Sequence, residues 1–442
     1  MRHSRVIVLI VFLVVWGLIT HGTYAGSGDE PHYLMIAQSL AFDGDVDLAN
    51  NYGQPGNLIG AGELQIDGHA QPGVGGVLRP VHDIGMPLLF APYVRLAYPV
   101  AETLARVLPE SLMRATRLNP PLIFRHFISL AMAVLTGWLG VQLFALFARS
   151  GASSRPFDDA EGKPFDDAQG RQAMWWALLL TLSPPLLSHS FLFFTEIPSA
   201  LLVAWLARVF GEGPGAQGSG LRAAAWGLRP GAFYAVVGAA IGMLLLIHVR
   251  NVALVMVFGV WAVIRLRRTP RSMWVYAATG AAVPLMIRTV VVHRFWGTYL
   301  TTPIARPDFT LGPLEATGEV LMRAVLLLGS PDFGLLSLAP IFVLALPGLW
   351  LLRKHPIADP RAVWALVASY LATLLLPYTN PWGVNGGFAP AARMIVPIVP
   401  LLAVAVFTAA QALPTVARVF VVIQIVIDVV VWQWPKVLWS SQ

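Results

Sequence analysis

The residues best suited to chemistry come directly after the first apolar segment of the chain. Residues 6–20 form an apolar run, and Asp29 and Glu30 follow as adjacent carboxylates in a sequence in which 12% of residues are charged. Charge this close to a membrane-spanning segment is costly unless it is paired or used. Pro31 suits the first position of a helix, where Asp29 or Glu30 can cap the exposed amides. The sequence therefore predicts a carboxylate general base at a helix start near the membrane surface.

Three polar residues farther along the chain are predicted to lie on the same side of the membrane. Glu196 lies where two apolar segments meet, Arg250 lies in a polar break between two more, and Arg393 opens a late apolar segment. Glu196 can act on a substrate or simply cap a helix. Arginines on the external side of the membrane are unusual, because basic residues are in excess on the cytoplasmic side. They therefore need an anionic partner, which can be a carboxylate, a lipid headgroup or a substrate phosphate. A base with a phosphate clamp is suited to move a group off a phosphorylated lipid.

The stretch between the first two apolar segments supplies further candidates. His82 beside Asp83 can be an acid–base or metal-binding pair, or a structural one. Residues 43–52 alternate aspartates as a calcium loop does, but the glycine and the closing glutamate of such a loop are missing. A turn that satisfies its own backbone is the simpler interpretation, so a divalent cation is a hypothesis without assigned ligands. The residues predicted to contact substrate are His32, Tyr33, Arg79, His82, Asp83, Arg250 and Arg393.

The composition places these candidates in a membrane protein. Of 442 residues, 56% are hydrophobic and 15 are tryptophan, and the mean hydropathy is +0.66, far above the range of soluble domains. The formal net charge of +7 is carried mostly by connectors between apolar segments, so it reports membrane topology and not nucleic acid. The absence of cysteine excludes disulfides, thiolate metal sites and thiol nucleophiles.

Apolar runs of spanning length predict an all-α polytopic bundle of about eleven transmembrane helices. With the N-terminus in the cytoplasm, the basic connectors fall on the cytoplasmic side. Residues 88–104 are then an interfacial or re-entrant helix of a long first external loop, residues 21–119, since a span there would invert every later connector. The predicted spans are residues 6–20, 121–148, 173–192, 195–210, 231–248, 251–265, 273–292, 333–352, 361–378, 392–410 and 415–434.

Two connectors carry no predicted chemistry. Residues 149–172 contain a direct repeat with paired aspartates, which indicates a disordered, solvated cytoplasmic loop more than a metal site. Residues 211–229 begin with a glycine-rich stretch and are predicted to be a flexible cytoplasmic loop. The chain, residues 1–442, is expected to form a single transmembrane domain. Its first apolar run is interpreted as a retained anchor, with a cleaved signal peptide as the alternative.

Together these features resemble the GT-C superfamily of membrane glycosyltransferases. The resemblance rests on the Asp29–Glu30 pair after the first span, the long helical first loop, the carboxylate at Glu196 and the late arginine in the segment 391–397. In layout it covers the chain to near residue 300, and later residues only through Arg393. The bacterial branch with protein O-mannosyltransferases and the lipid A aminoarabinose transferase is the nearest in appearance.

The resemblance implies a polyprenyl-phosphate-linked sugar as donor and an inverting transfer on the external, periplasmic face of a bacterial-type inner membrane. Asp29 matches the acidic position of the family's first loop and would be the catalytic carboxylate. Glu30 can take that role instead, and Glu196 is a third catalytic candidate. Arg79 is only a loose counterpart of a basic residue that relatives place in this loop, and metal dependence varies within the family. The soluble C-terminal domain of some relatives is not recognised, so recognition of a peptide sequon is not expected.

The alternative function is a transporter or flippase of lipid-linked sugars, which would also need arginines for the phosphate and a long apolar body. A transporter keeps ionisable residues near the middle of the bilayer and often uses broken helices. A structural scaffold would leave the adjacent carboxylates unexplained. The expected partners are a lipid-linked sugar donor, a glycan, lipid or protein acceptor, and membrane lipids. Nucleic acid is not expected, and no cofactor is required by the sequence, although a divalent cation is possible.

Overall fold

The structure is a computed structural model of the chain. It describes residues 2–21, 28–52, 66, 68–116, 118–152, 167–211, 229–267, 269–299, 302–303, 310, 312–354, 360–380, 383–384, 386–387 and 389–438. Most of the predicted loops 149–172 and 211–229 lies outside these residues, as does the candidate cleavage site at 23–25. The predictions for these segments stay untested.

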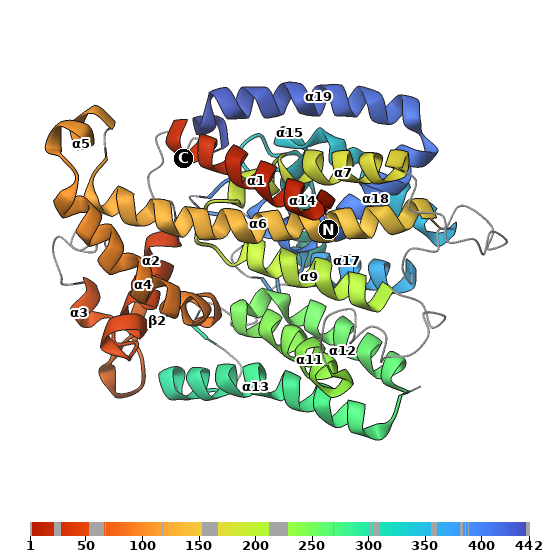
Figure 1. Cartoon of the computed structure of the whole chain (residues 1–442). Coiled ribbons are helices and arrows are strands. Elements are labelled where there is room, and N and C mark those ends of the chain that lie inside the picture. The colour runs from red at the N-terminus through yellow and green to blue at the C-terminus, as the bar shows by residue number, and fades with distance from the viewer. Residues whose placement is uncertain are drawn as a thin grey trace.

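The first half of the chain builds two long helices, α1 and α6, with a helical insertion between them (Figure 1). Its elements are α1 (Arg2–His21), α2 (Glu30–Gln38), the π-helix η1 (Ser39–Asp43), α3 (Ala49–Tyr52), β1 (Ala70–Pro72), the 3₁₀-helix η3 (Val74–Gly76), β2 (Leu78–Pro80), α4 (Gly85–Val107), α5 (Glu110–Thr116), α6 (Pro120–Ala152), α7 (Asp167–Thr181), α8 (Leu186–His189) and α9 (Glu196–Gly211).

The second half adds further helices along the same direction, with α19 covering one side of the bundle and α13 the other (Figure 1). Its elements are α11 (Pro230–Ile247), η4 (Val249–Asn251), α12 (Val252–Leu266), α13 (Arg271–Trp296), α14 (Pro313–Gly329), α15 (Leu335–Leu338), η5 (Pro340–Leu344), α16 (Ala345–Leu351), η6 (Leu352–Lys354), α17 (Pro360–Leu375), η7 (Arg393–Ile398), α18 (Val399–Ala412), α19 (Pro414–Gln433) and η8 (Pro435–Leu438).

Seven of the described helical segments are apolar and long enough to cross a membrane. This confirms the predicted class, an all-α polytopic integral membrane protein. The other four predicted spans coincide with the shorter helices α7, α9, α15 to α16, and α17. The seven segments are His3–Thr20, Pro120–Ala148, Pro230–Ile247, Val249–Leu266, Arg271–Trp296, Arg393–Ala412 and Pro414–Gln433.

Residues 88–104, which were predicted to form an interfacial or re-entrant helix and not a membrane span, belong to the helix α4. It has 23 residues and is not among the membrane-spanning candidates. Ala91, Val94, Ala97 and Ala101 are buried at helical spacing, whereas Leu96 between them is 72% exposed. Such one-sided burial is typical of an amphipathic helix that packs on a bundle. The helix α14 was not predicted, because its charged residues interrupt the apolar pattern.

Two glycines permit close approaches of backbone, one between α11 and α13 and one between the first loop and α11. A Cβ at Gly238 of α11 would lie 2.0 Å from the carbonyl oxygen of Ala277 in α13, so only glycine permits this helix pair. A Cβ at Gly85 would lie 2.3 Å from the carbonyl oxygen of Leu246. The start of α4 is therefore pressed against the end of α11, which fixes the loop residues just before it.

The segments α2, α3, α4 and the β1–β2 hairpin gather at one end of the bundle (Figure 1). The hairpin is antiparallel, with Ala70 opposite Pro80. A small apolar core that includes Ile36, Leu48 and Phe295 holds these elements to α13. The main apolar core is continuous from Ile7 in α1 to Val431 in α19. The described residues of the first loop therefore form a cap on one end of the bundle.

Candidate active site

Asp29 stands at the start of α2 with its carboxylate turned away from the helix. Gly28 before it has φ of 52°, a left-handed conformation that favours glycine. The helix begins at Glu30, one residue before the predicted start, and the Asp29 side chain makes no capping hydrogen bond. The capping role considered for Asp29 is therefore wrong. Its Oδ2 accepts a hydrogen bond from Nη2 of Arg393 at 2.7 Å, and the Asp29 side chain is 23% exposed.

Arg393 joins two carboxylates from distant parts of the chain. Besides Asp29, its Nε donates to Oε1 of Glu196 at 2.8 Å, and its Nη1 donates to the carbonyl oxygen of Gly386 at 3.1 Å. The guanidinium lies 4.2 Å from the ring centre of Phe194, in cation–π contact. Arg393 is 5% exposed, so its charge is compensated almost wholly by these partners. Three kinds of partner were predicted for the outer arginines, and Arg393 binds one of them, a carboxylate of the first loop.

The backbone before Arg393 is held in an unusual conformation. Ala392 has φ of 60°, a region that costs a non-glycine residue roughly 1–2 kcal/mol. The Ala392 amide donates to the carbonyl oxygen of Phe333 at 2.9 Å, and the Tyr370 hydroxyl donates to the carbonyl oxygen of Met394 at 2.9 Å. These contacts fix the start of η7 from both sides. Strained backbone of this kind is concentrated at functional sites, where it sets the direction of one side chain.

Glu196 extends the row of charges to a second arginine. It is the first residue of α9 and is 1% exposed. Its Oε1 lies 3.9 Å from Nη1 of Arg250, which belongs to η4 between α11 and α12. Asp29, Arg393, Glu196 and Arg250 thus form a row of alternating charge, which we call the charge row. The structure brings together residues from four separated parts of the sequence, as predicted from their common side of the membrane.

Glu30 occupies a different place from its neighbour. It is 1% exposed, and its Oε1 accepts a hydrogen bond from the Phe193 amide at 2.9 Å. This bond joins α2 to the segment that leads into α9. The two adjacent carboxylates therefore have different surroundings. Asp29 is partly accessible beside Arg393, whereas Glu30 is buried and bound to a backbone amide.

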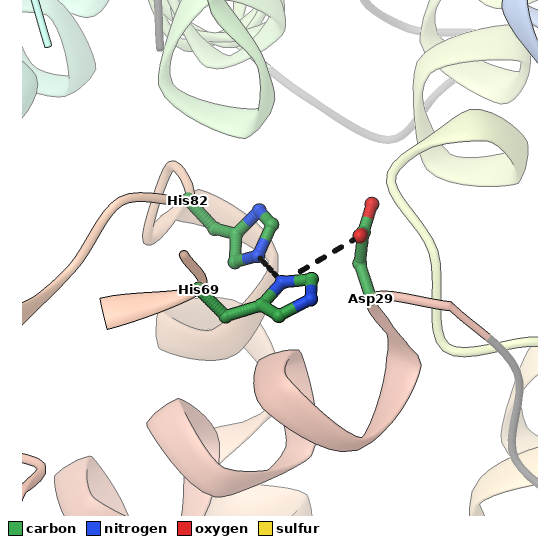
Figure 2. Close-up of side chains that lie close together, drawn as sticks. All are labelled: Asp29, His69 and His82. Atoms are coloured by element: carbon green, nitrogen blue, oxygen red, sulfur yellow. Dashed lines mark hydrogen bonds and ion pairs between the residues drawn. The ribbon is translucent and has the colours of Figure 1, made fainter. Parts of the chain in front are cut away.

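Two histidines at the ends of the hairpin lie beside Asp29, as Figure 2 shows. His69 precedes β1 and His82 follows β2, and His69 Nδ1 lies 2.9 Å from His82 Nε2. The same His69 Nδ1 lies 3.8 Å from Oδ1 of Asp29. These three ligand atoms all lie within 4.8 Å of one another, close enough to hold a metal ion. Oδ1 and Oδ2 of Asp29 thus face different partners.

His32 and two tyrosines support this arrangement. The His32 ring stacks on the His69 ring with 3.7 Å between centres, and His32 Nδ1 lies 2.7 Å from the Tyr52 hydroxyl. Tyr33 is 1% exposed, and its ring centre lies 4.9 Å from that of His82. We call His32, His69 and His82 the histidine cluster. The predicted residues His32, Tyr33 and His82 are therefore grouped around Asp29, together with His69, which was not among the predicted site residues.

The predicted pairing of His82 with Asp83 is not made. Asp83 Oδ2 accepts a hydrogen bond from the Val249 amide at 2.7 Å, and its Oδ1 lies 3.6 Å from Nε of Arg288 in α13. Burial raises the pKa of Asp83, whereas Arg288 and the Val249 amide act to lower it. Asp83 therefore anchors the loop to α11 and α13, while His82 faces Asp29.

Arg79 lies on β2, and its guanidinium is 5.0 Å from the ring centre of Phe295 at the end of α13. A Cβ at Gly73 on the other side of the hairpin would lie 2.4 Å from the Phe295 carbonyl oxygen. Arg79 therefore packs where the hairpin meets α13. It is not among the ion-pair partners of Asp29, which are Arg393 and His69 in the described part of the chain.

The aspartates of residues 43–52 use their oxygens locally. Asp45 Oδ1 accepts from the Ser39 hydroxyl at 3.2 Å and from the Asp47 amide at 3.0 Å. Asp43 Oδ2 accepts a hydrogen bond from the side-chain nitrogen Nδ2 of Asn51 at 3.0 Å. These bonds favour the turn that satisfies its own backbone. Among the described residues, this stretch is not part of any group placed to hold a metal.

Burial and neighbouring charges set opposite protonation preferences around Asp29. Burial by itself would raise the pKa of Asp29, but the charge of Arg393 holds it well below its usual range. Burial lowers the pKa of His82 to about 4, and burial with the neighbouring histidines lowers the pKa of His32 to about 3. At neutral pH the site therefore combines an ionised Asp29 with neutral imidazoles at His32 and His82.

His69 is the site residue that sequence reasoning missed. The available signal was weak: one histidine before and one after a short stretch rich in glycine and proline. An antiparallel hairpin brings such flanking residues together, and here the Val81 amide donates to the His69 carbonyl oxygen at 3.1 Å. Recognising the hairpin in the sequence would have paired His69 with His82.

Comparisons with known proteins give a distant likeness in fold. No protein family model matches the chain, and no curated protein matches it. A crystal structure of the Archaeoglobus fulgidus oligosaccharyltransferase, tethered to an acceptor peptide containing the NVT sequon, is 12% identical with a TM-score of 0.42 and covers 98% of this chain and 54% of that chain. AglB from the same organism, in complex with an inhibitory peptide and a dolichol-phosphate, is 12% identical with a TM-score of 0.43 and covers 99% and 56%.

The chain thus spans just over half the length of the oligosaccharyltransferase chains to which it is similar. A likeness at this level does not transfer a substrate or a residue's role.

Proposed function

We propose that the chain is a membrane glycosyltransferase of the GT-C type, which transfers a sugar from a polyprenyl-phosphate-linked donor to a hydroxyl of a glycan, lipid or protein acceptor. The observation that carries the proposal is the bond between Arg393 and Asp29 at 2.7 Å. In this bond a partly accessible carboxylate lies beside a guanidinium, a group suited to bind a phosphate, at the end of an apolar bundle. A base and a cation for the leaving group are the two components that this transfer needs.

The reaction follows from these positions. Asp29 takes the proton of the acceptor hydroxyl while the hydroxyl oxygen attacks the anomeric carbon of the sugar. The bond from that carbon to the phosphate oxygen breaks, and polyprenyl phosphate leaves with the electron pair. A single displacement of this kind inverts the configuration. Arg393 and Arg250 are the cations that stabilise the charge developing on the phosphate.

Arg393 also couples donor binding to the basicity of Asp29. In the structure the guanidinium of Arg393 holds the pKa of Asp29 below its usual range, which makes Asp29 a weak base. A donor phosphate that binds Arg393 compensates the same positive charge. The pKa of Asp29 then rises, because an opposite charge near it has been neutralised. The carboxylate becomes a better base only when the donor is present.

The two neighbouring carboxylates suit other roles. Glu30 is enclosed and accepts the Phe193 amide, so it supports the position of α2 better than it serves as base. Glu196 faces both arginines, at 2.8 Å from Arg393 and 3.9 Å from Arg250. We assign Glu196 to orienting these cations and Asp29 to proton transfer.

The proposal includes a location. We place the N-terminus in the cytoplasm and the site on the external face of a bacterial-type inner membrane. The C-terminal ends of α6, α9 and α12 lie at the end of the bundle opposite α2 and α4 (Figure 1). Arg208, Arg265 and Arg267 lie at two of these ends, which fits the excess of basic residues on the cytoplasmic side.

A transfer assay tests the proposal. Purified protein is given radiolabelled polyprenyl-phosphate sugars with candidate acceptors, and release or transfer of the sugar is followed for the wild type, Asp29→Asn and Asp45→Asn. We expect turnover by the wild type and by Asp45→Asn, whose carboxylate serves a turn, and its loss in Asp29→Asn. Equal turnover by all three proteins would refute Asp29 as the base.

The same donors test the transporter alternative in proteoliposomes. A transporter would move the labelled donor across the bilayer and leave the sugar–phosphate bond intact. The charge row disfavours this alternative, because Glu196 begins α9, Arg250 precedes α12 and Arg393 precedes α18. Ionisable residues at helix ends suit a reaction at the membrane surface, whereas transport sites lie near the midplane. Movement without bond cleavage would favour the transporter.

A further inference from the structure

A groove formed by three helices lies apart from the charge row and the histidine cluster. Its walls are residues of α1, α6 and α9, and its volume is about 510 Å³. Pockets that hold small molecules have volumes of about 300–1,000 Å³. The start of α1 lies away from α2 and α4 in the bundle (Figure 1). The groove is therefore large enough for a ligand, and it shares no residue with the candidate active site.

The helices α1 and α6 run in opposite directions along this groove. The His3 ring of α1 stacks on the Phe144 ring of α6, with 5.6 Å between their centres. Farther along α1, a Cβ at Gly137 of α6 would lie 3.2 Å from Cα of Val8. Gln142 lies between these two contacts on α6, so it is nearer the start of α1 than Val8 is.

The end of the groove nearest the start of α1 is polar and basic. Arg5 of α1, Gln142 of α6 and Arg208 in the last turn of α9 line it. No carboxylate is among the described residues that line the groove. Gln142 is 2% exposed, and its Oε1 accepts no hydrogen bond within the described part of the chain. A buried oxygen without a donor is costly, so this end offers two cations and an acceptor that lacks a donor.

The other end of the groove is apolar and open. Leu9 and Phe12 of α1 and Trp138 of α6 line it, and Leu9 and Trp138 are 57% and 53% exposed. Phe12 lies about 10 Å beyond Arg5 along α1, at a rise of 1.5 Å per residue. Both helices contain segments long and apolar enough to cross a membrane. The apolar end therefore faces lipid chains, and the polar end faces their headgroups.

We propose that this groove binds one anionic phospholipid of the phosphatidylglycerol class. Arg5 and Arg208 bind the phosphate through charge-assisted hydrogen bonds. A headgroup hydroxyl donates to Oε1 of Gln142, and an acyl chain lies along the apolar end. Basic pockets between membrane helices are known to bind anionic headgroups. Arginines that extend toward water along their apolar stems would explain the two cations, but not the buried acceptor beside them.

A lipid in this groove contacts α1, α6 and α9 together. The helix α9 begins at Glu196 of the charge row, so the lipid holds the far end of a helix that carries part of the candidate active site. A ligand that binds only the folded protein raises its unfolding temperature. The binding does not rest on the proposed function, because the groove takes no part in the transfer reaction.

Native mass spectrometry of the purified full-length protein in detergent counts bound lipids and tests the site. Phosphatidylglycerol is titrated against the wild type, Arg5→Gln, Arg208→Gln and the double variant. Each substitution should weaken binding of the first lipid about 5-fold, and the two together roughly 25-fold. The matched control is Arg267→Gln, because Arg267 is an exposed arginine at the end of α12 and does not line the groove. Unfolding temperatures without added lipid show that the variants fold.

Phosphatidylmethanol separates the headgroup hydroxyl from the charge. It has the same negative phosphate diester and the same acyl chains, but no hydroxyl on its headgroup. The wild type should bind phosphatidylglycerol about 5-fold more tightly than phosphatidylmethanol, the effect of one hydrogen bond. Gln142→Leu should bind the two lipids equally. The comparison on the wild type does not depend on the folding of any variant.

Glycerol phosphate tests whether the acyl chain contributes. It has the headgroup without the chains, so it should not displace the lipid at equal concentration. Equal binding by the wild type and the double variant, equal binding of both lipids by the wild type, or displacement by glycerol phosphate would each overturn the proposal. A loss in Arg267→Gln as large as in the groove variants would also overturn it. Sugar transfer is not measured in these titrations, so their result is independent of the proposed function.

Discussion

Two aspartates of the first loop, Asp29 and Asp45, differ in how far along the chain their hydrogen-bond partners lie. Asp29 is bound by Arg393, 364 residues later in the chain. Asp45 is bound by Ser39 and by the Asp47 amide, at most six residues away. Both carboxylates belong to one loop, and in the sequence both were candidates for a functional role. A carboxylate bound by neighbouring residues stabilises a turn, whereas a carboxylate bound by a distant, buried arginine forms part of a candidate active site.

The energetic reason lies in burial. An exposed aspartate in a turn keeps its water and gains only a modest hydrogen bond. Arg393 is 5% exposed and Glu196 is 1% exposed, and such buried charges are tolerated only with their partners in place. The charge row therefore depends on all of its members, while the turn at residues 43–52 can lose one bond at little cost.

The largest effect is expected for Arg393→Met, which tests the charge row most severely. Loss of the guanidinium leaves Asp29 without its arginine and leaves Glu196 with only the more distant Arg250, at 3.9 Å. Breaking a buried pair in this way costs about 3–5 kcal/mol of stability. Thermal or denaturant unfolding of the purified protein measures it, and sugar transfer should fall to background. Arg393→Lys is the matched control, which keeps the charge but not the fork that reaches two carboxylates. An unchanged midpoint in Arg393→Met would contradict the importance of the row.

Asp29→Asn is expected to act on rate more than on stability. Under the proposed function it removes the base, which lowers turnover by roughly 100- to 10,000-fold, while Arg393 keeps its bond to Glu196. Initial rates at saturating donor measure the effect, with the unfolding midpoint as a check on folding. A large drop in stability at unchanged rate per folded molecule would assign Asp29 to the fold instead.

A pH change from 7 to 5 should loosen the region of the histidine cluster. The pKa of His32 is lowered to about 3 by burial and its histidine neighbours, so the unfolded chain takes up the proton first, below its usual pKa near 6.5. Stability is therefore present above pH 6.5 and is lost as the pH falls toward 3. For His32 alone this is at most about 2 kcal/mol at pH 5.

Unfolding midpoints of chelator-treated protein at pH 7 and pH 5 measure this loss. His32→Gln should reduce the difference between the two pH values, because glutamine takes up no proton. The same difference in wild type and variant would show that other groups are responsible.

The smallest effect is expected for Asp45→Asn, which completes the comparison. Asparagine can still accept a hydrogen bond from Ser39 through its side-chain carbonyl. Its stability should stay within about 1 kcal/mol of the wild type, and its transfer rate should not change. A loss as large as that of Arg393→Met would show that the turn at residues 43–52 has a role beyond its own backbone.

Hydropathy predicted most of the fold because membrane spans are local features of the sequence. Seven of the eleven predicted spans coincide with long apolar helices, and α4 was rightly kept apart from them. The helix α14 was not predicted because Glu319 and Arg323, which form an ion pair at 3.1 Å, interrupt its apolar run. One pair of charged residues therefore obscured a helix that the same pair helps to stabilise.

The membrane class, the long first loop and the candidates Asp29, Glu196, Arg250 and Arg393 could be predicted from the sequence, because apolar length and the placement of charge can be read along one dimension. The folded structure sets which side chains meet. It separated Asp29 from Glu30, turned Asp83 toward Arg288, and brought His69 to His82 and Asp29. These outcomes depend on helix packing and hairpin register, which set side-chain direction and cannot be read from spacing alone.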